Sequence, residues 1–218
     1  ASSERQLVLL LGSKTTSEVW VLDAATPQGE FRCMAAREEE HDYDVDHGQL
    51  NGAWSWFIRS NQNGINFALY SAKQSAAHEE PPTRGHWKEL IAHDPQVMLE
   101  GFSLNADAYV LSLRQAGLPV IQVHPAGQSS YRVHLPDAAY NLSIQDTLEF
   151  ASPLIRLRYE ALNRPAQIRQ LDLASGDQQV LKETAVLGPF DADDYVTQRV
   201  WAAAPDGTQV PISLVAKR

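Results

Sequence analysis

The sequence predicts an all-β protein made of about four four-stranded blades of a β-propeller, an incomplete ring, followed by one β-hairpin. The first observation is a series of short apolar runs, rich in valine, isoleucine and aromatic residues, that turn residues separate. The second is the lack of any long stretch with helical period. The third is a recurring two-strand unit whose period is close to that of propeller blades, each of which has about four strands.

The recurring unit is an apolar strand, a polar turn and a second strand. It occurs four times, and its anchor residues Leu22, Leu69, Val123 and Leu171 are 47, 54 and 48 residues apart. A β-sandwich also has many short strands at regular spacing, so it stays open as the alternative. The repeat is longer than the period of a simple hairpin, and it therefore favours radial repetition.

The expected strands follow the apolar runs in chain order. They cover 6–12, 18–23, 30–35, 42–46, 53–59, 65–71, 87–91, 98–104, 108–114, 119–124, 131–135, 142–147, 154–160, 167–173, 178–182, 195–203 and 208–216. The blades are expected near 1–36, 40–92, 97–136 and 141–183. Residues 72–86 are polar and contain prolines, which predicts a long loop inside a hairpin, although 73–80 leaves a short helix as the less favoured alternative.

Composition excludes several classes of function. With 18 basic and 27 acidic residues the net charge is −9, a field that repels phosphate backbones, so we expect no nucleic-acid partner. The single cysteine, Cys33, cannot form an internal disulfide, which fits a reducing compartment and predicts a cytoplasmic location. The apolar run 7–11 is too short for a signal peptide or a membrane span. Because the chain starts in a strand-like pattern, we expect it to be a piece of a longer protein.

Motifs that carry chemistry on their own are missing. There is no Gly-x-Ser-x-Gly nucleophile elbow, since the segment from Gly101 through Ser103 to Asn105 lacks the second glycine. There is also no Cys-x-x-Cys, no His-Glu-x-x-His and no phosphate-binding glycine loop. We therefore expect no catalytic residue, no cofactor and no metal site in this chain.

An acidic segment runs from His41 to His47. Asp42, Asp44 and Asp46 match the first three ligand positions of a calcium-binding loop, but the glycine and the bidentate glutamate that such a loop needs are replaced by His47 and Ala53. Calcium is therefore disfavoured.

The same segment reads better as a strand. Alternation places Tyr43 and Val45 on one face and the three aspartates on the other. The aspartates then form either an ordinary solvated face or an acidic lining for cationic peptides. The two histidines are expected to be surface or hydrogen-bonded residues, not ligands.

Several segments resemble the oligopeptidase B subgroup of the prolyl oligopeptidase family. They are Arg-Ser-Asn-Gln-Asn-Gly-Ile-Asn-Phe (59–67), Leu-Glu-Gly-Phe (99–102), Arg-Val-Trp (199–201), Asp-Gly-Thr-Gln-Val-Pro-Ile-Ser-Leu-Val (206–215) and the acidic segment 41–47. The resemblance keeps the same order along nearly the whole chain.

This resemblance implies a seven-bladed propeller joined to an α/β-hydrolase domain with a Ser-Asp-His triad, which cleaves short peptides after Arg or Lys. It implies a partial propeller over 1–187, an interdomain hinge over 188–194 with Gly188 and Pro189, and the first strands of the peptidase domain over 195–218. The triad would lie beyond residue 218, so the chain would gate substrate entry and be inactive by itself.

The expected partners follow from the expectation that the chain is only part of the propeller and lacks most of the peptidase domain. They are short basic peptides, for the parent enzyme, together with the missing blades and the hydrolase domain. Two apolar blade faces left open to water predict that the isolated chain self-associates. The alternative function is a stand-alone propeller or sandwich that binds a partner without any peptidase.

Overall fold

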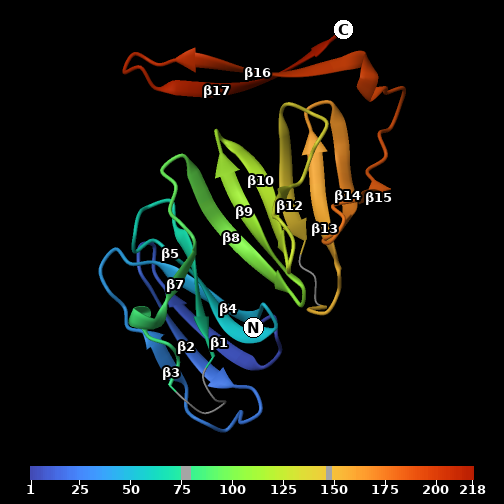
Figure 1. The fold of residues 1–218 in the computed structure, drawn as a ribbon. Helices are drawn as coiled ribbons and strands as arrows, with labels where there is room; N and C mark the ends of the chain where they lie inside the picture. The colour runs from blue at the N-terminus through green and yellow to red at the C-terminus, as the bar shows by residue number, and fades with distance from the viewer. Residues whose placement is uncertain (75–79, 146–148) are drawn as a thin grey trace.

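The computed structural model describes residues 1–74, 80–145 and 149–218, and every sheet in it is antiparallel (Figure 1). The first sheet contains β1 (Gln6–Gly12), β2 (Ser17–Asp23) and β3 (Arg32–Ala35). The second contains β4 (Tyr43–Leu50), β5 (Ala53–Ser60), β6 (Ala68–Lys73) and β7 (Lys88–Ile91). The third contains β8 (Val97–Asn105), β9 (Ala108–Gln115), β10 (Leu118–Pro125) and β11 (Tyr131–Arg132). The fourth contains β12 (Tyr140–Gln145), β13 (Leu154–Ala161), β14 (Arg164–Asp172) and β15 (Gln178–Glu183), and the hairpin contains β16 (Tyr195–Ala203) and β17 (Gln209–Lys217).

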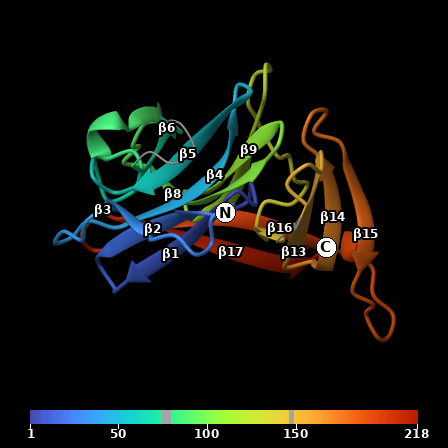
Figure 2. The same cartoon turned by 90° about the horizontal axis from the view of Figure 1, so that it is seen from below.

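The four sheets fan out face against face, as the blades of a propeller do, and the hairpin crosses one end of the third and fourth sheets (Figures 1 and 2). Three separate apolar cores fill the spaces between consecutive sheets. A two-sheet sandwich would have one core between its sheets. The middle sheets are instead covered on both faces, so the propeller prediction is confirmed and the sandwich alternative is wrong.

Alternation along the strands produces this two-sided packing. In β5, Trp56 and Ile58 belong to the core shared with the first sheet, whereas Phe57 between them belongs to the core shared with the third. In β9, Val110 faces the fourth sheet and Leu111 faces the second. Successive side chains of a strand point to opposite faces, so a run of consecutive apolar residues fits a strand that is buried on both sides.

The first sheet differs from the expected four-stranded blade because it has three strands. The anchors Leu22, Leu69, Val123 and Leu171 all lie in the strand before the last of their sheets, namely β2, β6, β10 and β14. The sheets are therefore equivalent units, and the first lacks a counterpart of β4, β8 and β12 among the described residues.

Most expected strands differ from the observed ones by a few residues at one end, and three of these differences have a clear structural form. The strand expected over 42–46 continues to Leu50 through Gly48, where an added Cβ would lie 2.9 Å from Leu104 Cδ1 of the third sheet. The strand expected over 65–71 begins at Ala68, because Phe67 ends the preceding turn with a left-handed φ of 61°. The strand expected over 131–135 has only two residues. Gly48 thus lies inside β4, at a position where the close approach of the third sheet leaves no room for a side chain.

The outward face of the first sheet is apolar. Register places Leu7 opposite Leu22 and Leu9 opposite Trp20, on the face away from the second sheet. Leu7, Leu9 and Leu11 are 42%, 44% and 40% exposed. This surface agrees with the expectation of an apolar terminal blade face.

The outward face of the fourth sheet is polar, and here the expectation of a second apolar face is wrong. The strands alternate so that Ile155, Leu157 and Tyr159 face the third sheet, which leaves Arg156 and Arg158 on the outside. Any self-association of the isolated chain through blade faces would therefore have to use the first sheet.

Short 3₁₀ helices occupy 84–86 and 192–194, and no helix among the described residues is long and apolar enough to span a membrane. The less favoured helix over 73–80 falls mostly on residues that lie outside the described ranges.

Candidate functional site

Strand β4 contains the acidic segment. The face of β4 that carries Tyr43 and Val45 is packed into the core between the first two sheets. Tyr43 is 1% exposed, and its hydroxyl donates to the Ala35 carbonyl at 2.6 Å while it accepts from the Val19 amide at 2.8 Å. Burial raises the pKa of Tyr43 to about 12, so its hydroxyl keeps its proton. Val45 packs against the same core. This anchoring forces the aspartates onto the opposite face, as the alternation predicted.

Asp44 forms an ion pair within the second sheet with Arg59, and Arg59 in turn hydrogen-bonds to the third sheet. The Arg59 Nε lies 2.7 Å from Asp44 Oδ1, the Arg59 Nη1 donates to the Leu99 carbonyl at 3.2 Å, and the guanidinium lies 4.1 Å from the centroid of the Phe67 ring. Burial raises the pKa of the Asp44 carboxyl, and the Arg59 charge opposes this shift. Asp44 therefore helps to join two sheets.

Asp46 and Asp42 have different surroundings. Asp46 Oδ1 accepts from the backbone amides of Ser2, at 2.7 Å, and His47, at 2.8 Å, and its other oxygen accepts from the Ser2 hydroxyl. The Asp42 amide donates to Asn61 Oδ1 at 2.9 Å, but within the described ranges its carboxylate makes no hydrogen bond or ion pair. Of the three candidate lining residues, only Asp42 has a carboxylate available to a ligand.

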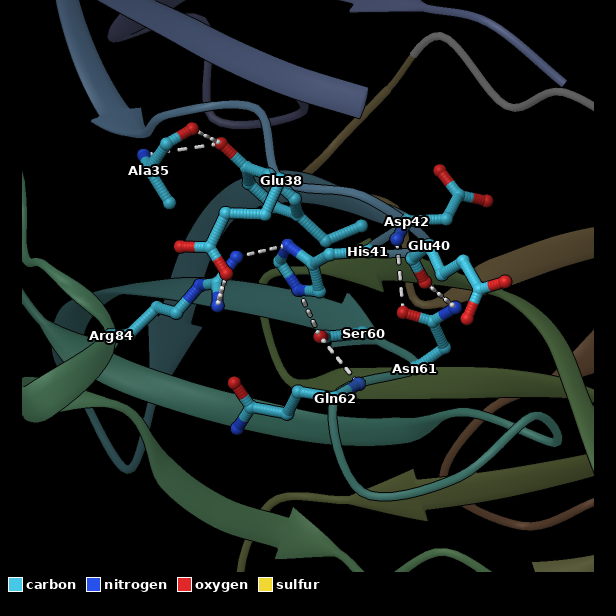
Figure 3. Close-up of polar contacts among 10 residues, drawn as sticks. Ala35, Glu38, Glu40, His41, Asp42, Ser60, Asn61, Gln62 and Arg84 are labelled. Atoms are coloured by element: carbon cyan, nitrogen blue, oxygen red, sulfur yellow. Dashed lines mark hydrogen bonds and ion pairs between the residues drawn. The ribbon is translucent and has the colours of Figure 1, made fainter. Parts of the chain in front are cut away.

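Beside Asp42, a buried histidine joins three parts of the chain (Figure 3). Arg84 donates to His41 Nδ1, so that nitrogen carries no proton, and the Nε2–H donates to Ser60 Oγ at 2.9 Å. Arg84 also contacts Glu38 Oε2 at 2.8 Å. Burial, followed by the Arg84 charge, lowers the pKa of His41 and so favours its neutral form.

The His41–Ser60 pair has the geometry of a base and a nucleophile, but Ser60 is 0% exposed. Its hydroxyl also accepts from the Gln62 amide at 3.2 Å. A substrate carbonyl cannot reach this oxygen, so the pair fastens the β3–β4 connection to the end of β5. Sequence reasoning missed this pair because its two members are 19 residues apart and belong to no motif.

The His47 imidazole is buried, and both of its ring nitrogens bond neutral side chains. Its Nδ1 bonds Ser3 Oγ at 2.7 Å, its Nε2 bonds Gln74 Oε1 at 2.7 Å, and its ring stacks on Trp54 at 5.4 Å. Burial lowers the pKa of His47 to about 4. Both histidines of the acidic segment are thus hydrogen-bonded structural residues.

The hairpin rests on a turn of the third sheet. Arg199 donates to the Ala116 carbonyl. Gly117 has a φ of +77°, and a Cβ there would lie 2.9 Å from Arg199 Nη2 and 3.3 Å from Pro211 Cγ. A glycine is needed both for the left-handed turn and for the close approach of the hairpin.

A cleft of about 480 Å³ lies where the hairpin passes the fourth sheet. It is lined by Ala139, Tyr140, Asn141, Glu160, Ala161, Leu162, Arg164, Pro165, Ala166 and Ser213. The described residues contain no group of three or more histidines, cysteines or acidic residues that could hold a metal ion.

The opposite face of the hairpin is apolar and open. Alternation and register place Val200 beside Ile212, and Val210 and Leu214 on the same face, whereas Pro211 points toward the propeller. The exposed fractions are 38% for Val200, 39% for Ile212, 45% for Val210 and 43% for Leu214. A surface of this kind usually packs against another layer of protein.

The proposed hinge lies between β15 and β16. Gly188 has a φ of +105° and no atom within 4 Å of an added Cβ, so a side chain there would be disfavoured by the backbone alone. Pro189 follows it, and Leu187 before it is 98% exposed. The connection therefore makes few contacts.

Comparison with known proteins identifies relatives over the whole chain. Residues 1–184 match the family model described as the N-terminal β-propeller domain of prolyl oligopeptidase. Dipeptidyl aminopeptidase BI from Pseudoxanthomonas mexicana is 32% identical over 217 residues, which are 99% of this chain and 28% of that protein. Protease 2 from Moraxella lacunata is 21% identical over 99% of this chain and 29% of that protein.

Solved structures of proteins from the same family are also similar to this chain. Oligopeptidase B from Trypanosoma brucei, in a closed form with covalently bound antipain, superposes with a TM-score of 0.83 at 27% identity, over 100% of this chain and 31% of that one. Oligopeptidase B from Leishmania major gives 0.82 at 26% identity, over 100% and 31%. The chain spans less than a third of the length of each relative.

The link through Asp44 can be tested by removing its cation. Replacing Arg59 by Met should lower the free energy of unfolding by about 1.5–3 kcal/mol, because a carboxylate between two sheets loses its charged hydrogen bond. Adding Asp44→Asn to that variant should restore part of the loss. Urea denaturation measures both. Lys217→Met, which removes an exposed 3.7 Å ion pair with Asp194, should cost less than about 1 kcal/mol. An unchanged stability of the Arg59 variant would contradict the structural role.

The burial of His47 predicts a specific pH dependence of stability. In the unfolded chain the imidazole binds a proton near pH 6.5, whereas in the fold it does so near pH 4. The unfolded state therefore binds more protons between these values, so stability is highest above about pH 6.5 and falls toward pH 4, by on the order of 3 kcal/mol. The variant His47→Gln should show a flatter profile in denaturation between these pH values. His134→Gln, at an exposed position, should leave the slope unchanged.

Proposed function

The chain belongs to the prolyl oligopeptidase family, and from that premise we propose that it is the part of the β-propeller that controls entry of short peptides to a serine-peptidase site carried elsewhere in the intact protein. In this proposal the chain supplies selection and no chemistry. A propeller that covers an active site excludes folded proteins and admits short flexible chains, and such gating can limit turnover.

The observation that carries the proposal is the two-sided hairpin. One face contacts the third sheet through Arg199 and Pro211, and the other presents Val200, Ile212 and Leu214 to solvent. A hairpin that is fixed on the propeller and apolar on its far side is suited to begin a second domain that sits on the propeller. The hydrolase domain implied by the family resemblance fits this position.

The chemistry would then follow the serine-hydrolase scheme. A serine attacks the scissile carbonyl, a histidine takes the serine proton and later gives it to the leaving amine, and backbone amides stabilise the oxyanion. None of these groups is assigned to the present chain. Ser60 is buried, and Ser103 lies in β8 without a histidine partner among the described contacts.

For the substrate, we propose short peptides with Arg or Lys before the cleaved bond. The resemblance of segments such as 59–67 to the oligopeptidase B subgroup supports this choice, and so do the net charge of −9 and the unpaired carboxylate of Asp42. The second candidate is release of N-terminal dipeptides, because a relative at 32% identity is named a dipeptidyl aminopeptidase.

Two fluorogenic peptides separate these activities in the full-length protein. We expect rapid cleavage of a peptide with a blocked N-terminus and an internal Arg, and no cleavage of a folded protein. Release only from peptides with a free N-terminus would favour the dipeptidyl activity.

The 218-residue chain alone should cleave neither peptide and should not react with a serine-directed phosphonate, because it lacks a nucleophile elbow. Stoichiometric labelling of any of its serines, for example Ser103, would overturn the proposal.

Asp42 provides a test of electrostatic attraction. Asp42→Asn in the full-length enzyme should lower kcat/KM for the Arg peptide by several-fold at low salt and much less at about 0.5 M salt, since screening weakens attraction between exposed charges. Asp177→Asn, at an exposed turn of the fourth sheet, is the matched control. Equal effects at both salt concentrations would leave Asp42 as an ordinary solvated residue. Asp44 is unsuitable for this test because its replacement also breaks the link to Arg59.

A further inference from the structure

The outward face of the fourth sheet is unlike the other blade faces of this chain. Register defines two rows across it, Gln145–Arg156–Gln170–Gln179 and Ser143–Arg158–Ile168–Lys182. Only Ile168 in these rows is aliphatic. The corresponding outward face of the first sheet consists mainly of leucines and a tryptophan, with Glu18 opposite Leu11, so the polarity is a property of this face and not of terminal blades in general.

The charges on this face do not balance within the chain. Glu160 contacts Arg158 at 3.5 Å and accepts from Asn141 at 3.3 Å, and Asp172 accepts from two backbone amides of the β14–β15 turn. Both carboxylates are therefore engaged. Arg156 and Lys182 make no ion pair or hydrogen bond with any described residue. The face presents cations without partners, on a chain whose net charge is −9.

The position of the face in the fan indicates what covers it. Each sheet packs its face on the next, and after β15 the chain leaves for the hairpin instead of starting another blade beside the fourth sheet. In a ring, the neighbour of this face must come from a part of the protein outside residues 1–218. The chain spans less than a third of its relatives, so such a part fits their length.

We propose that the seam between the fourth sheet and this neighbouring blade is ionic, and that the neighbour presents carboxylates to Arg156 and Lys182, beside the Arg158–Glu160 pair. Like charges on one face repel, and covering cations without partners is costly, so the covering surface has to supply negative charge. The other seams are closed by apolar cores that salt does not screen. This seam therefore loosens as ionic strength rises, while the other blades stay packed.

The ionic seam requires that a further blade packs on the fourth sheet, and it does not depend on the peptidase activity. A thiol reporter on the face tests it in the full-length protein. In a Cys33→Ser background, Ser143→Cys places a thiol in the second row, at an exposed position of β12. Ala174→Cys, in the exposed β14–β15 turn, is the matched reference.

At about 0.05 M salt we expect the thiol at position 143 to react at least about tenfold more slowly than the reference thiol, and at about 1 M salt the two rates should converge. In the 218-residue chain, position 143 should react rapidly at every salt concentration. Arg156→Glu with Arg158→Glu should abolish the low-salt protection, whereas Arg132→Glu, on the exposed rim of the third sheet, should not.

Three outcomes would overturn the inference. Rapid reaction at low salt in the full-length protein would show that water covers this face and the ring is open there. Protection that persists at about 1 M salt would show a dry seam without an ionic basis. Protection that depends on protein concentration would assign the face to a second copy of the protein.

Discussion

The fold depends on strands that bury both of their faces. Trp56, Phe57 and Ile58 are consecutive and almost fully buried, and they belong alternately to two cores. A sheet with this composition is unstable unless it is covered on both sides, because its apolar side chains would meet water. The need for two covering layers makes each sheet recruit the next, and the series can end only where a face is polar or where another part of the protein takes over.

Hydrogen bonds and ion pairs of a few side chains join the ends of these sheets. Arg59 joins β4, β5 and β8 through one guanidinium, and His41 joins the β3–β4 connection to β5 and to the loop that carries Arg84. Both lie where the apolar cores thin out toward the ends of the strands. The acidic strand is therefore mostly structural: two of its three aspartates hold neighbouring segments, and Asp42 alone remains for a role in attraction.

Much of the fold could be predicted from the sequence, because apolar alternation and turn residues are local signals. The repeat anchors identified equivalent strands, and the period favoured a propeller over a sandwich. Two kinds of feature could not be predicted. The extension of β4 through Gly48 could not be predicted, because the close approach of Leu104 from another sheet leaves no local signal in the sequence. The partners of Asp44 and His41 come from residues 15 to 43 positions away, so only the assembled sheets bring them together.

The described contacts of the hairpin are all with the last two of the four sheets. Its described contacts are with Ala116 and Gly117 of the third sheet and with the edge of the fourth, and it is joined to the fourth sheet by the sparsely packed segment around Gly188. Among the described residues, whatever the hairpin carries is therefore supported over the third and fourth sheets and not over the first two, where the Asp42 carboxylate lies.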